Sequence, residues 1–413
     1  MSLRIFYSIG IYIASFVIKL LSLFNTKLKQ GVNGRTETFQ KLKNSIQPND
    51  KTFWFHCASL GEYEQGLPVF EALKTKHPNY RIVLSFFSPS GYEVRKNTKL
   101  ADVVVYLPLD TKANAKRFLD IVNPDYIIFV KYEIWPNVLL EIKKRQLNAI
   151  LISAVFRENQ SFFKWYGRFM KSALFGFKHI FTQDENSKTL LNSINYQNTS
   201  ISGDTRFDRV SNQLKVDNSV SFIEEFKADK LCVVLGSTWP EDDKLYIDFI
   251  NNHSKQNIKF IIAPHNIKPS YTTSLHSQLE LKTISFSEMN NKDLSNYNVF
   301  IMDTIGYLSK VYSYAEIAYV GGAAGSTGLH NILEPAVFGI PILIGENHDK
   351  FPEAKKLIKI GGLNSVSTSK VFESTINELI NNSSIREKQG SINKDYIQKN
   401  RGAVLQILDY IHI

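Results

Sequence analysis

The chain has 413 residues, of which 43% are hydrophobic and 12% aromatic, and its formal net charge is +10 at pH 7. Its length and apolar content suffice for two hydrophobic cores, and they exclude a disordered or low-complexity protein. The positive charge indicates an anionic partner, such as nucleic acid, an acidic membrane surface or a phosphorylated substrate. With only two cysteines, Cys57 and Cys232, neither a disulfide framework nor a cysteine-based zinc site is possible, which suits a reducing cytoplasm.

The first distinctive segment is apolar. Residues 5–24 contain a single charged side chain, Lys19, and are about as long as a helix needs to cross the hydrocarbon layer of a membrane. They lack a small-residue cleavage site, and basic side chains gather at their end and beyond: Lys19, Lys27, Lys29, Arg35, Lys41 and Lys43. Positive charge on that side predicts an uncleaved anchor that keeps the rest of the chain in the cytoplasm. The alternatives are an amphipathic helix that lies on the membrane and a helix that packs on the domain.

From residue 52 onward, short β-rich runs alternate with helical stretches such as 64–76, 112–121 and 136–145. This alternation predicts right-handed βαβ units and parallel sheets. The predicted strands of the first half are Thr52–Cys57, Arg81–Phe86, Val103–Tyr106, Tyr126–Val130, Ala149–Ser153, His179–Thr182 and Thr199–Ser202. The predicted strands of the second half are Leu231–Leu235, Ile258–Ala263, Val299–Met302, Ile317–Val320 and Ile340–Ile344.

A polar stretch at 205–226, without a strong apolar period, separates the two halves. The sequence therefore predicts an α/β protein with two Rossmann-like parallel domains that face a cleft, in which ligands bind beyond the carboxyl ends of the strands. The predicted parts are a membrane-anchor helix at 1–26, a first Rossmann-like domain at 27–208, a linker at 209–226, a second Rossmann-like domain at 227–385, and closing helices at 386–413.

Two acidic motifs follow predicted strands of the first half. S-L-G-E at 59–62 places Glu62 on a turn between strand and helix, where a carboxylate can accept a proton from a sugar hydroxyl. Y-E-I-W-P-N at 132–137 places Glu133 at the equivalent position of another strand, so that two carboxylates can converge on the cleft. The alternative is that each glutamate only complements a helix N-terminus.

A third motif, S-G-D-T-R-F-D at 202–208, closes the first half. Arg206 offers a cation that suits a phosphate or carboxylate whose charge grows as a bond breaks. An ordinary surface arginine is the alternative.

The second half carries four strand-end loops of similar composition: G-S-T-W at 236–239, A-P-H-N at 263–266, D-T-I-G-Y-L at 303–308 and the glycine-rich 321–335. Glycines let the backbone approach an anion, and a helix beginning near His330 would direct free N–H groups toward it. The loops match neither the dinucleotide fingerprint nor a P-loop. Together they indicate a nucleotide site of another kind.

Two absences bear on the chemistry. No D-x-D triplet occurs, and the nine histidines show no metal-ligand spacing. Phosphate charge must then be met by basic side chains and helix N-termini. The sequence predicts no catalytic metal.

The segment at 155–179 is basic and rich in aromatic residues, and it is predicted as one amphipathic helix. Its cations Lys164, Arg168 and Lys171 suit a membrane interface or a phosphorylated lipid headgroup, the predicted acceptor and membrane contact. A core helix with solvated lysines is the alternative.

In their order, these motifs resemble the Kdo (3-deoxy-D-manno-octulosonic acid) transferase family of lipopolysaccharide inner-core synthesis. The resemblance covers most of the chain and also includes P-S-G at 89–91 and Y-L-P-L-D at 106–110. It implies an inverting, metal-independent GT-B glycosyltransferase without a cofactor. Such an enzyme moves Kdo from CMP-Kdo to a hydroxyl of the lipid A precursor, lipid IVA. The resemblance further implies that the first domain binds the acceptor and carries the catalytic base and that the second binds the CMP-sugar.

The resemblance also implies roles for individual residues. Glu62 would be the general base, while Glu133 and Arg206 would stabilise the transition state. Glu334 would take the ribose hydroxyls and Asn331 would lie near the phosphate. The implied CMP-binding residues are Ser237, Thr238, Pro264, His265, Ile305, Gly306, Tyr307, Asn331, Ile332, Leu333 and Glu334. The implied partners are CMP-Kdo, the lipid A precursor and an anionic membrane surface, with no nucleic acid, at the cytoplasmic face of the inner membrane.

Three positions depart from the family pattern. Lys131 stands where many relatives carry Glu, Pro264 where others carry Arg, and Leu329 where others carry Gly. None is one of the three implied catalytic positions, but the lost Arg leaves the detail of CMP phosphate binding open.

The rival interpretations are another GT-B transferase, such as a lipid A disaccharide synthase-like enzyme, a UDP-sugar 2-epimerase-type isomerase, and a non-catalytic basic membrane protein. The anchor and the basic aromatic segment count against the isomerase. The carboxylates at the strand ends count against a non-catalytic protein.

Overall fold

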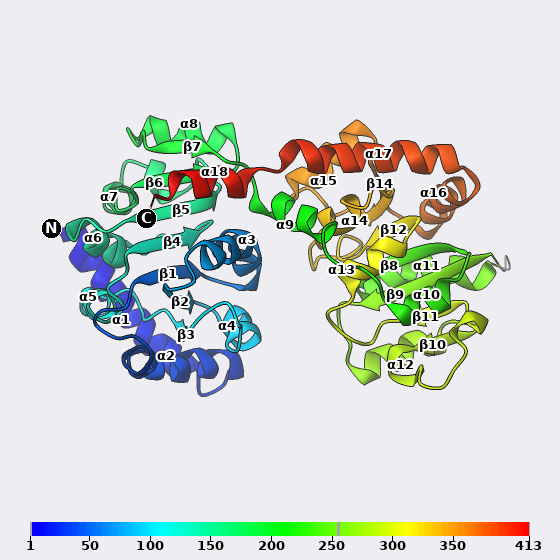
Figure 1. Cartoon of the computed structure of the whole chain (residues 1–413), viewed down its shortest axis with the longest axis horizontal. Coiled ribbons are helices and arrows are strands. Elements are labelled where there is room, and N and C mark those ends of the chain that lie inside the picture. The colour runs from blue at the N-terminus through cyan, green and yellow to red at the C-terminus, as the bar shows by residue number, and fades with distance from the viewer. Residues whose placement is uncertain (1, 254–256, 413) are drawn as a thin grey trace. The chain divides into compact units, whose positions relative to one another are not determined.

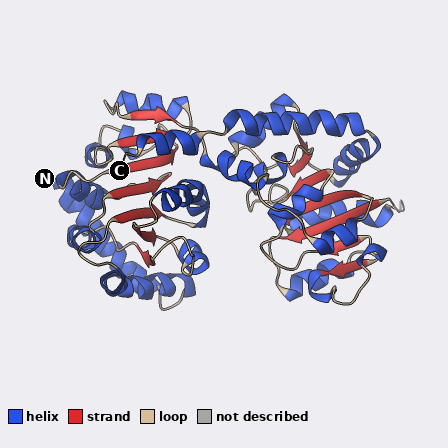
Figure 2. Cartoon of the chain, viewed as in Figure 1, coloured by secondary structure: helices blue, strands red, loops and turns tan. Residues whose placement is uncertain are grey.

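The computed structural model describes residues 2–253 and 257–412 and divides into two compact units. The first unit comprises the residues up to Arg209 together with those from Arg401 onward, and the second comprises Val210–Asn400. Each unit is one seven-stranded parallel sheet with helices on both faces (Figures 1 and 2). The predicted α/β class with two Rossmann-like domains of the GT-B type is confirmed.

The first unit begins with two helices and then alternates strands with helices. Its strands are β1 (Thr52–Cys57), β2 (Arg81–Phe86), β3 (Val103–Tyr106), β4 (Tyr126–Val130), β5 (Ala149–Ala154), β6 (His179–Thr182) and β7 (Thr199–Ile201). Its helices are α1 (Ser2–Leu21), α2 (Thr26–Ser45), α3 (Leu60–Lys76), α4 (Pro89–Arg95), α5 (Lys112–Val122), α6 (Pro136–Lys144), the 3-10 turn η1 (Ser161–Phe163), α7 (Arg168–Leu174), α8 (Glu185–Ser193), α9 (Thr205–Gln213), which continues into the second unit, and α18 (Ala403–Tyr410).

The strand order of the first sheet is β3-β2-β1-β4-β5-β6-β7. The chain builds outward from β1 in one direction, then returns and builds outward from β4 in the other, so β1 and β4 flank the topological switch point. In the register Phe53 lies opposite both Ile82 and Tyr126. Ligands in doubly wound sheets bind at such a point, beyond the carboxyl ends of the strands.

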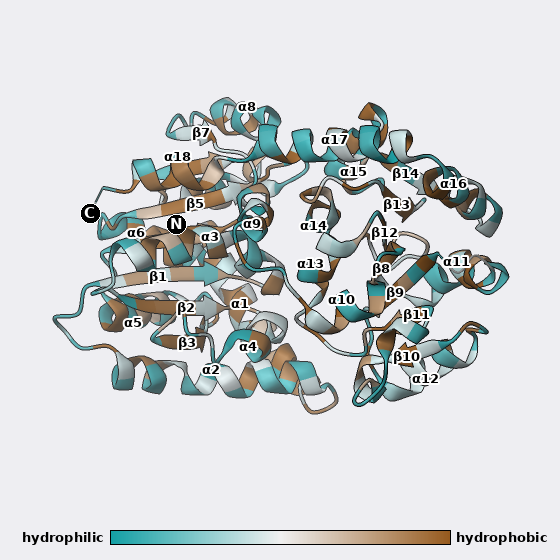
Figure 3. Cartoon of the chain, turned by 45° about the vertical axis from the view of Figure 1, so that its right-hand side comes forward, coloured by the Kyte–Doolittle hydropathy of each residue, from teal (hydrophilic) through white to brown (hydrophobic). Residues whose placement is uncertain are grey.

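Strand β1 is buried over its whole length because it is covered on both faces. Phe55 stacks on Phe70 of α3 at a ring-centroid distance of 4.1 Å. Trp54, which points to the other face, packs on Phe118 of α5 at 4.6 Å. The alternating side chains of one strand therefore hold a helix on each side of the sheet. Figure 3 shows the hydrophobic strands of both units inside more hydrophilic helices such as α17.

The second sheet has the order β10-β11-β9-β8-β12-β13-β14, with its switch point between β8 and β12. Its strands are β8 (Leu231–Thr238), β9 (Ile258–Pro264), β10 (Thr283–Ser285), β11 (Val299–Ile301), β12 (Ile317–Val320), β13 (Ile342–Gly345) and β14 (Leu363–Val366). Its helices are α10 (Ser221–Lys227), α11 (Pro240–Asn252), α12 (Pro269–Ser277), η2 (Phe286–Glu288), η3 (Leu294–Asn296), α13 (Leu308–Val311), η4 (Tyr312–Tyr314), α14 (Leu333–Ala336), α15 (Pro352–Ile360), α16 (Ser369–Asn381) and α17 (Ser383–Asn400).

The sequence did not predict the two edge strands β10 and β14. Both are short, and their segments T-I-S and L-N-S-V each contain two polar residues, so they lack the continuous apolar run of a central strand. The predicted linker at 209–226 contains the end of α9 and the first part of α10.

The prediction of a single helix at 155–179 is wrong. After β5 the chain makes the turn η1, whose Phe162 is buried in the core of the first unit, and then enters the short helix α7. At Gly167 the backbone passes so close to Ser161 that a Cβ would lie 1.5 Å from its carbonyl oxygen. The core contact and this tight return divide the segment, and Trp165 between them is 94% exposed.

Helix α1 docks on the first unit with its polar side. Arg4 Nε donates to Asn137 Oδ1 at 3.0 Å, and the Tyr7 hydroxyl donates to Asp110 Oδ2 at 2.8 Å. The Tyr7 ring also lies 5.4 Å from the ring of Phe169 in α7. The outward side is apolar, with Phe6 69% exposed. This helix, over Leu3–Leu21, is long and apolar enough to cross a membrane by length and composition.

Candidate active site

Two carboxylates flank the switch point of the first sheet. Glu62 stands in the first turn of α3, directly after β1, and Glu133 stands directly after the neighbouring strand β4. Parallel strands end at the same edge of a sheet, so both turns lie at one edge. Each carboxylate acts on the other, because the charge of Glu133 helps to raise the pKa of Glu62.

One oxygen of Glu62 serves the helix cap. Its Oε2 accepts hydrogen bonds from the backbone N–H of Ser59 at 2.8 Å and from the Ser59 hydroxyl at 3.2 Å. The capping function considered from the sequence is therefore present. The other oxygen, Oε1, accepts no hydrogen bond from any residue that the structure describes. Burial first, and the charge of Glu133 second, raise the pKa of Glu62 above its ordinary value, which makes it a stronger base once it is ionised.

Glu133 is buried and held in one position. Its Oε2 accepts from the indole N–H of Trp135 at 2.8 Å and faces His56 Nε2 at 2.9 Å. On the other side of the His56 ring, Nδ1 lies 2.9 Å from Ser85 Oγ, and that hydroxyl accepts from the indole N–H of Trp54 at 2.8 Å. His56 Nδ1 also lies 3.2 Å from the Ser85 carbonyl oxygen, and Nε2 lies 3.0 Å from the Trp135 indole nitrogen, so both ring nitrogens have polar partners.

His56 was not singled out from the sequence. It lies in the apolar strand segment F-W-F-H-C, where a buried histidine is usually only a packed residue. The available signal was that it precedes S-L-G-E by a few residues on the strand that carries Glu62.

Arg206 lies near the same edge, at the start of α9. Its Nε and Nη2 bind Asp204 Oδ2 at 2.8 and 2.7 Å, and Asp204 Oδ1 accepts from Gln65 of α3 at 3.1 Å. The Tyr132 side chain, which is 37% exposed, interacts electrostatically with both Arg206 and Glu62. Burial first, and the charge of Glu62 among others, raise the pKa of Tyr132, while Arg206 lowers it. The structure thus brings Glu62, Glu133 and Arg206 together in one unit.

The predicted nucleotide residues lie at the carboxyl ends of four adjacent strands, β11, β9, β8 and β12. Ser237 and Thr238 end β8, Pro264 ends β9, and the Thr238 carbonyl accepts the N–H of His265 at 3.0 Å. Ser237 has a φ of 55°, a left-handed turn that bends the strand end. The sheet topology gathers these loops at the second switch point.

The turns from β11 and β12 complete the group. Ile305 is 79% exposed and precedes Gly306, whose φ of 94° favours glycine. Asn331 Nδ2 donates to Glu334 Oε1 at 3.1 Å, so the two residues hold each other. The helix expected near His330 begins only at Leu333 and ends at Ala336, because residues 321–332 are turns that follow the glycines.

The glycine-rich loop after β12 is fixed by a buried carboxylate. Asp242 Oδ2 accepts from the N–H groups of Trp239 and Gly322, both at 2.8 Å, and its Oδ1 accepts from the Tyr319 hydroxyl at 2.7 Å. A Cβ at Gly322 would lie 2.1 Å from the Gly328 carbonyl, so a side chain cannot replace this glycine. The loop is rigid where it passes the strand ends.

Trp239 and His330 adjoin the predicted residues but were not predicted as part of the site. The Trp239 ring stacks on His265 at 4.6 Å, and its N–H donates to His330 Nε2 at 3.1 Å. Burial lowers the pKa of His330 to about 4, so this imidazole is neutral at pH 7 and can accept the hydrogen bond. Trp239, His265 and His330 form a cluster of stacked and tilted rings next to Thr238.

The basic side chains Lys164, Arg168 and Lys171 line one shallow pocket together with Lys143 of α6 and the exposed Trp165. Helix α1 lies beside them through the contact of Tyr7 with Phe169. Among the residues that the structure describes, no group of three His, Cys, Asp or Glu side chains could hold a metal ion.

Comparisons with known proteins bear on this arrangement. The family model described as 3-deoxy-D-manno-octulosonic-acid transferase matches residues 31–209. A 3-deoxy-D-manno-octulosonic acid transferase of Haemophilus influenzae is 26% identical over 410 residues, which cover 95% of this chain and 93% of the relative. Another, from Rickettsia bellii, is 27% identical over 316 residues, 75% of this chain and 74% of the relative.

Solved structures show the same fold. The UDP-GlcNAc 2-epimerase from Neisseria meningitidis bound to UDP-GlcNAc superposes with a TM-score of 0.62 at 15% identity, covering 87% of this chain and 98% of that one. A putative UDP-N-acetylglucosamine 2-epimerase from Listeria monocytogenes gives 0.57 at 12% identity, over 87% and 95%. The chain therefore has the two-domain parallel α/β fold of the GT-B type. The chain thus resembles the glycosyltransferases of the Kdo transferase family, and these relatives support Kdo transfer in lipopolysaccharide synthesis.

Proposed function

We propose that the protein transfers Kdo from CMP-Kdo to a sugar hydroxyl of the lipid A precursor, with inversion and without a metal. The relatives named as Kdo transferases support the transferred sugar. The observation that carries the mechanism is the pair Glu62 and Glu133 at the switch point of the first sheet.

Glu62 is the general base of this proposal. Its Oε1, which the helix cap does not use, takes the proton of the acceptor hydroxyl as that oxygen bonds to the anomeric carbon of Kdo. The bond from this carbon to the CMP phosphate breaks on the opposite side, and its electron pair leaves with CMP. Attack opposite to the leaving group inverts the anomeric centre.

Glu133 and Arg206 stabilise charge in the transition state. The sugar at the anomeric carbon becomes positively charged as the bond to phosphate breaks, and a buried carboxylate held by His56 and Trp135 suits that charge. Arg206, oriented by Asp204, suits the negative charge on the leaving phosphate or on the Kdo carboxylate.

The strand-end residues of the second unit bind CMP in this proposal. Glu334 accepts from the ribose hydroxyls, Asn331 lies near the phosphate, and the turn with Gly306 lets the backbone approach the nucleotide. Pro264 offers no cation where relatives carry Arg, so within the second unit the phosphate charge is met by neutral donors.

The acceptor reaches the protein at the cytoplasmic face of the inner membrane. The apolar outer side of α1 suits insertion at the membrane interface, and Lys164, Arg168 and Lys171 beside the exposed Trp165 suit anionic headgroups. The polar bonds of Arg4 and Tyr7 hold α1 along the first unit, which favours a helix lying on the membrane over one that crosses it alone.

The test is incubation of the protein with CMP-Kdo and lipid IVA, followed by mass spectrometry of the lipid. We expect one or more Kdo additions and release of CMP. A parallel incubation with UDP-GlcNAc, read for the 2-epimer, separates this function from that of the epimerases with the same fold. Epimer formation without Kdo addition would refute the proposal.

A further inference from the structure

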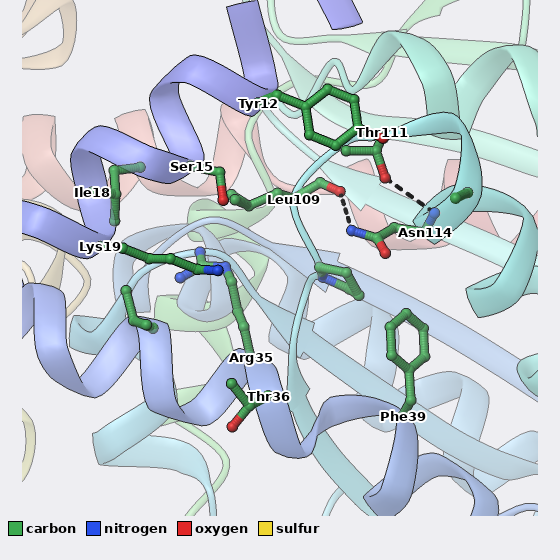
Figure 4. A pocket seen from close by; sticks show the side chains of 13 residues that line it. Tyr12, Ser15, Ile18, Lys19, Arg35, Thr36, Phe39, Leu109, Thr111 and Asn114 are labelled. Atoms are coloured by element: carbon green, nitrogen blue, oxygen red, sulfur yellow. Dashed lines mark hydrogen bonds between the residues drawn. The ribbon is translucent and has the colours of Figure 1, made fainter. Parts of the chain in front are cut away.

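A cavity of about 390 Å³ lies between α1, α2 and the loop that follows β3, and none of the roles assigned so far uses it (Figure 4). Its volume is within the range of small-molecule sites. The walls combine apolar side chains such as Ile18, Phe39 and Leu109 with the hydroxyls of Ser15 and Thr36. A pocket of this composition suits a ligand with an apolar chain and a polar head.

Two cations share this pocket. Lys19 of α1 and Arg35 of α2 both line it, and Figure 4 shows their ends directed toward one another. Lys19 forms no ion pair with any residue that the structure describes. No aspartate or glutamate is among the described residues that line the pocket. Two neighbouring positive charges without a counter-ion attract an anion.

Arg35 is partly buried, and no carboxylate among the residues that the structure describes pairs with it. Its guanidinium donates to the carbonyls of Gly31 at 3.0 Å, Leu107 at 3.1 Å and Phe87 at 2.5 Å. Burial lowers the pKa of Arg35 to about 10, which shows that this cation lacks full compensation. A phosphate group at the pocket would supply the missing charge and accept the remaining donors.

The pocket adjoins the catalytic edge of the sheet. The Arg35 guanidinium lies 4.7 Å from the centre of the Phe87 ring, and that ring lies 4.5 Å from Trp135, which donates to Glu133. Two aromatic rings therefore separate Arg35 from the buried carboxylate. A ligand held at the pocket by one end can extend its other end to the strand ends.

The wall formed by α1 has an apolar outer side, so a lipid chain can enter from the membrane without crossing water. We propose that this pocket binds a phosphate group of the acylated acceptor between Lys19 and Arg35, together with the first carbons of one acyl chain. The inference rests on the proposed function for the identity of the lipid. The pocket fixes the acceptor by its phosphate and so orients its sugar hydroxyl toward Glu62.

Direct lipid binding tests this inference independently of catalysis. Binding of lipid IVA in detergent micelles is measured by native mass spectrometry for the full chain and for Lys19→Glu, which places a negative charge at the pocket. Lys99→Glu is the matched control. Lys99 is exposed and belongs to the first unit, but it precedes β3 and so lies at the amino ends of the strands, whereas the pocket follows the carboxyl end of β3. We expect Lys19→Glu to weaken binding by about tenfold, the scale for turning one attractive charge repulsive near an anionic headgroup, and Lys99→Glu to leave it unchanged.

Ala113→Trp is the second variant, because Ala113 is an exposed wall residue and a large ring there fills the pocket without opening the core. It should weaken binding as Lys19→Glu does, with CMP-Kdo affinity retained in both. The Lys19→Glu effect should disappear with dephosphorylated lipid. Three results would each overturn the inference. The first is that Lys19→Glu and Lys99→Glu weaken lipid IVA binding equally, and the second is that Ala113→Trp binds the lipid normally. The third is that phosphatidylglycerol competes for the pocket as well as lipid IVA does. If lipid binding follows these expectations but no Kdo is transferred, the proposed function is rejected and the inference about the pocket stands.

Discussion

The substitution Glu62→Gln separates catalysis from helix capping at one residue. Glutamine keeps a carbonyl oxygen that can accept from the Ser59 N–H, so the capping box is retained. It cannot take a proton. Loss of a general base typically costs about 10²–10⁴ in rate, and turnover should fall on that scale. Affinity for CMP should be unchanged, because the predicted nucleotide residues belong to the other unit.

Glu62→Ala provides the comparison. It removes both the base and the cap. Loss of a helix cap lowers the free energy of unfolding by about 0.3 to 1.5 kcal/mol. Thermal unfolding should therefore separate the two variants while turnover does not: the unfolding midpoint of the Glu62→Gln variant stays near that of the wild type, and that of the Glu62→Ala variant falls.

Turnover is measured as CMP release at saturating CMP-Kdo and detergent-dispersed acceptor. If Glu62 only caps α3, Glu62→Gln retains near-normal turnover and Glu62→Ala loses activity in proportion to its stability. That pattern would refute the assignment of the base.

Three further predictions concern the neighbouring charges. Glu133→Gln removes the negative charge that helps to raise the pKa of Glu62. The acidic limb of the pH dependence of kcat/KM should therefore move to lower pH. An unmoved limb would show that the two carboxylates do not interact. Activity should persist in excess EDTA, and loss that added Mg²⁺ restores would count against the metal-free mechanism. Simultaneous charge reversal at Lys164, Arg168 and Lys171 should raise the acceptor KM but not the CMP-Kdo KM, and the increase should be smaller at high salt. An unchanged acceptor KM would show that these residues are ordinary solvated surface residues.

The sequence predicted all strands of the first sheet, edges included, but missed both edge strands of the second sheet. Central strands such as Thr52–Cys57 are apolar on both faces and follow turn residues, so the pattern alone identifies them. The edge strands Thr283–Ser285 and Leu363–Val366 bury less and carry no such pattern. The sequence pattern did not predict the order of the strands in either sheet, because strand order depends on contacts between residues far apart in the chain.

The site was predictable where motifs sit at strand ends, as with Glu62 and Glu133. The residues that orient these groups were not, because His56 and Trp239 gain their roles only through partners distant in the sequence. The error at 155–179 has the same origin. The aromatic residues of this segment do have helical spacing in the sequence. The burial of Phe162 and the close approach of the backbone at Gly167 depend on tertiary contacts, which the spacing does not contain.

Helix α18 belongs to the first unit although it follows the second unit in the chain. Asp208 accepts from the backbone N–H groups of Gly402 and Ala403, and the buried Ile407 and Ile411 complete the core beside Phe181. The ribosome therefore produces the whole second unit, Val210–Asn400, while the first still lacks this apolar patch. At ordinary elongation rates that interval is roughly 10–40 s. During it the first unit carries an open core, although its apolar helix α1 has already been made.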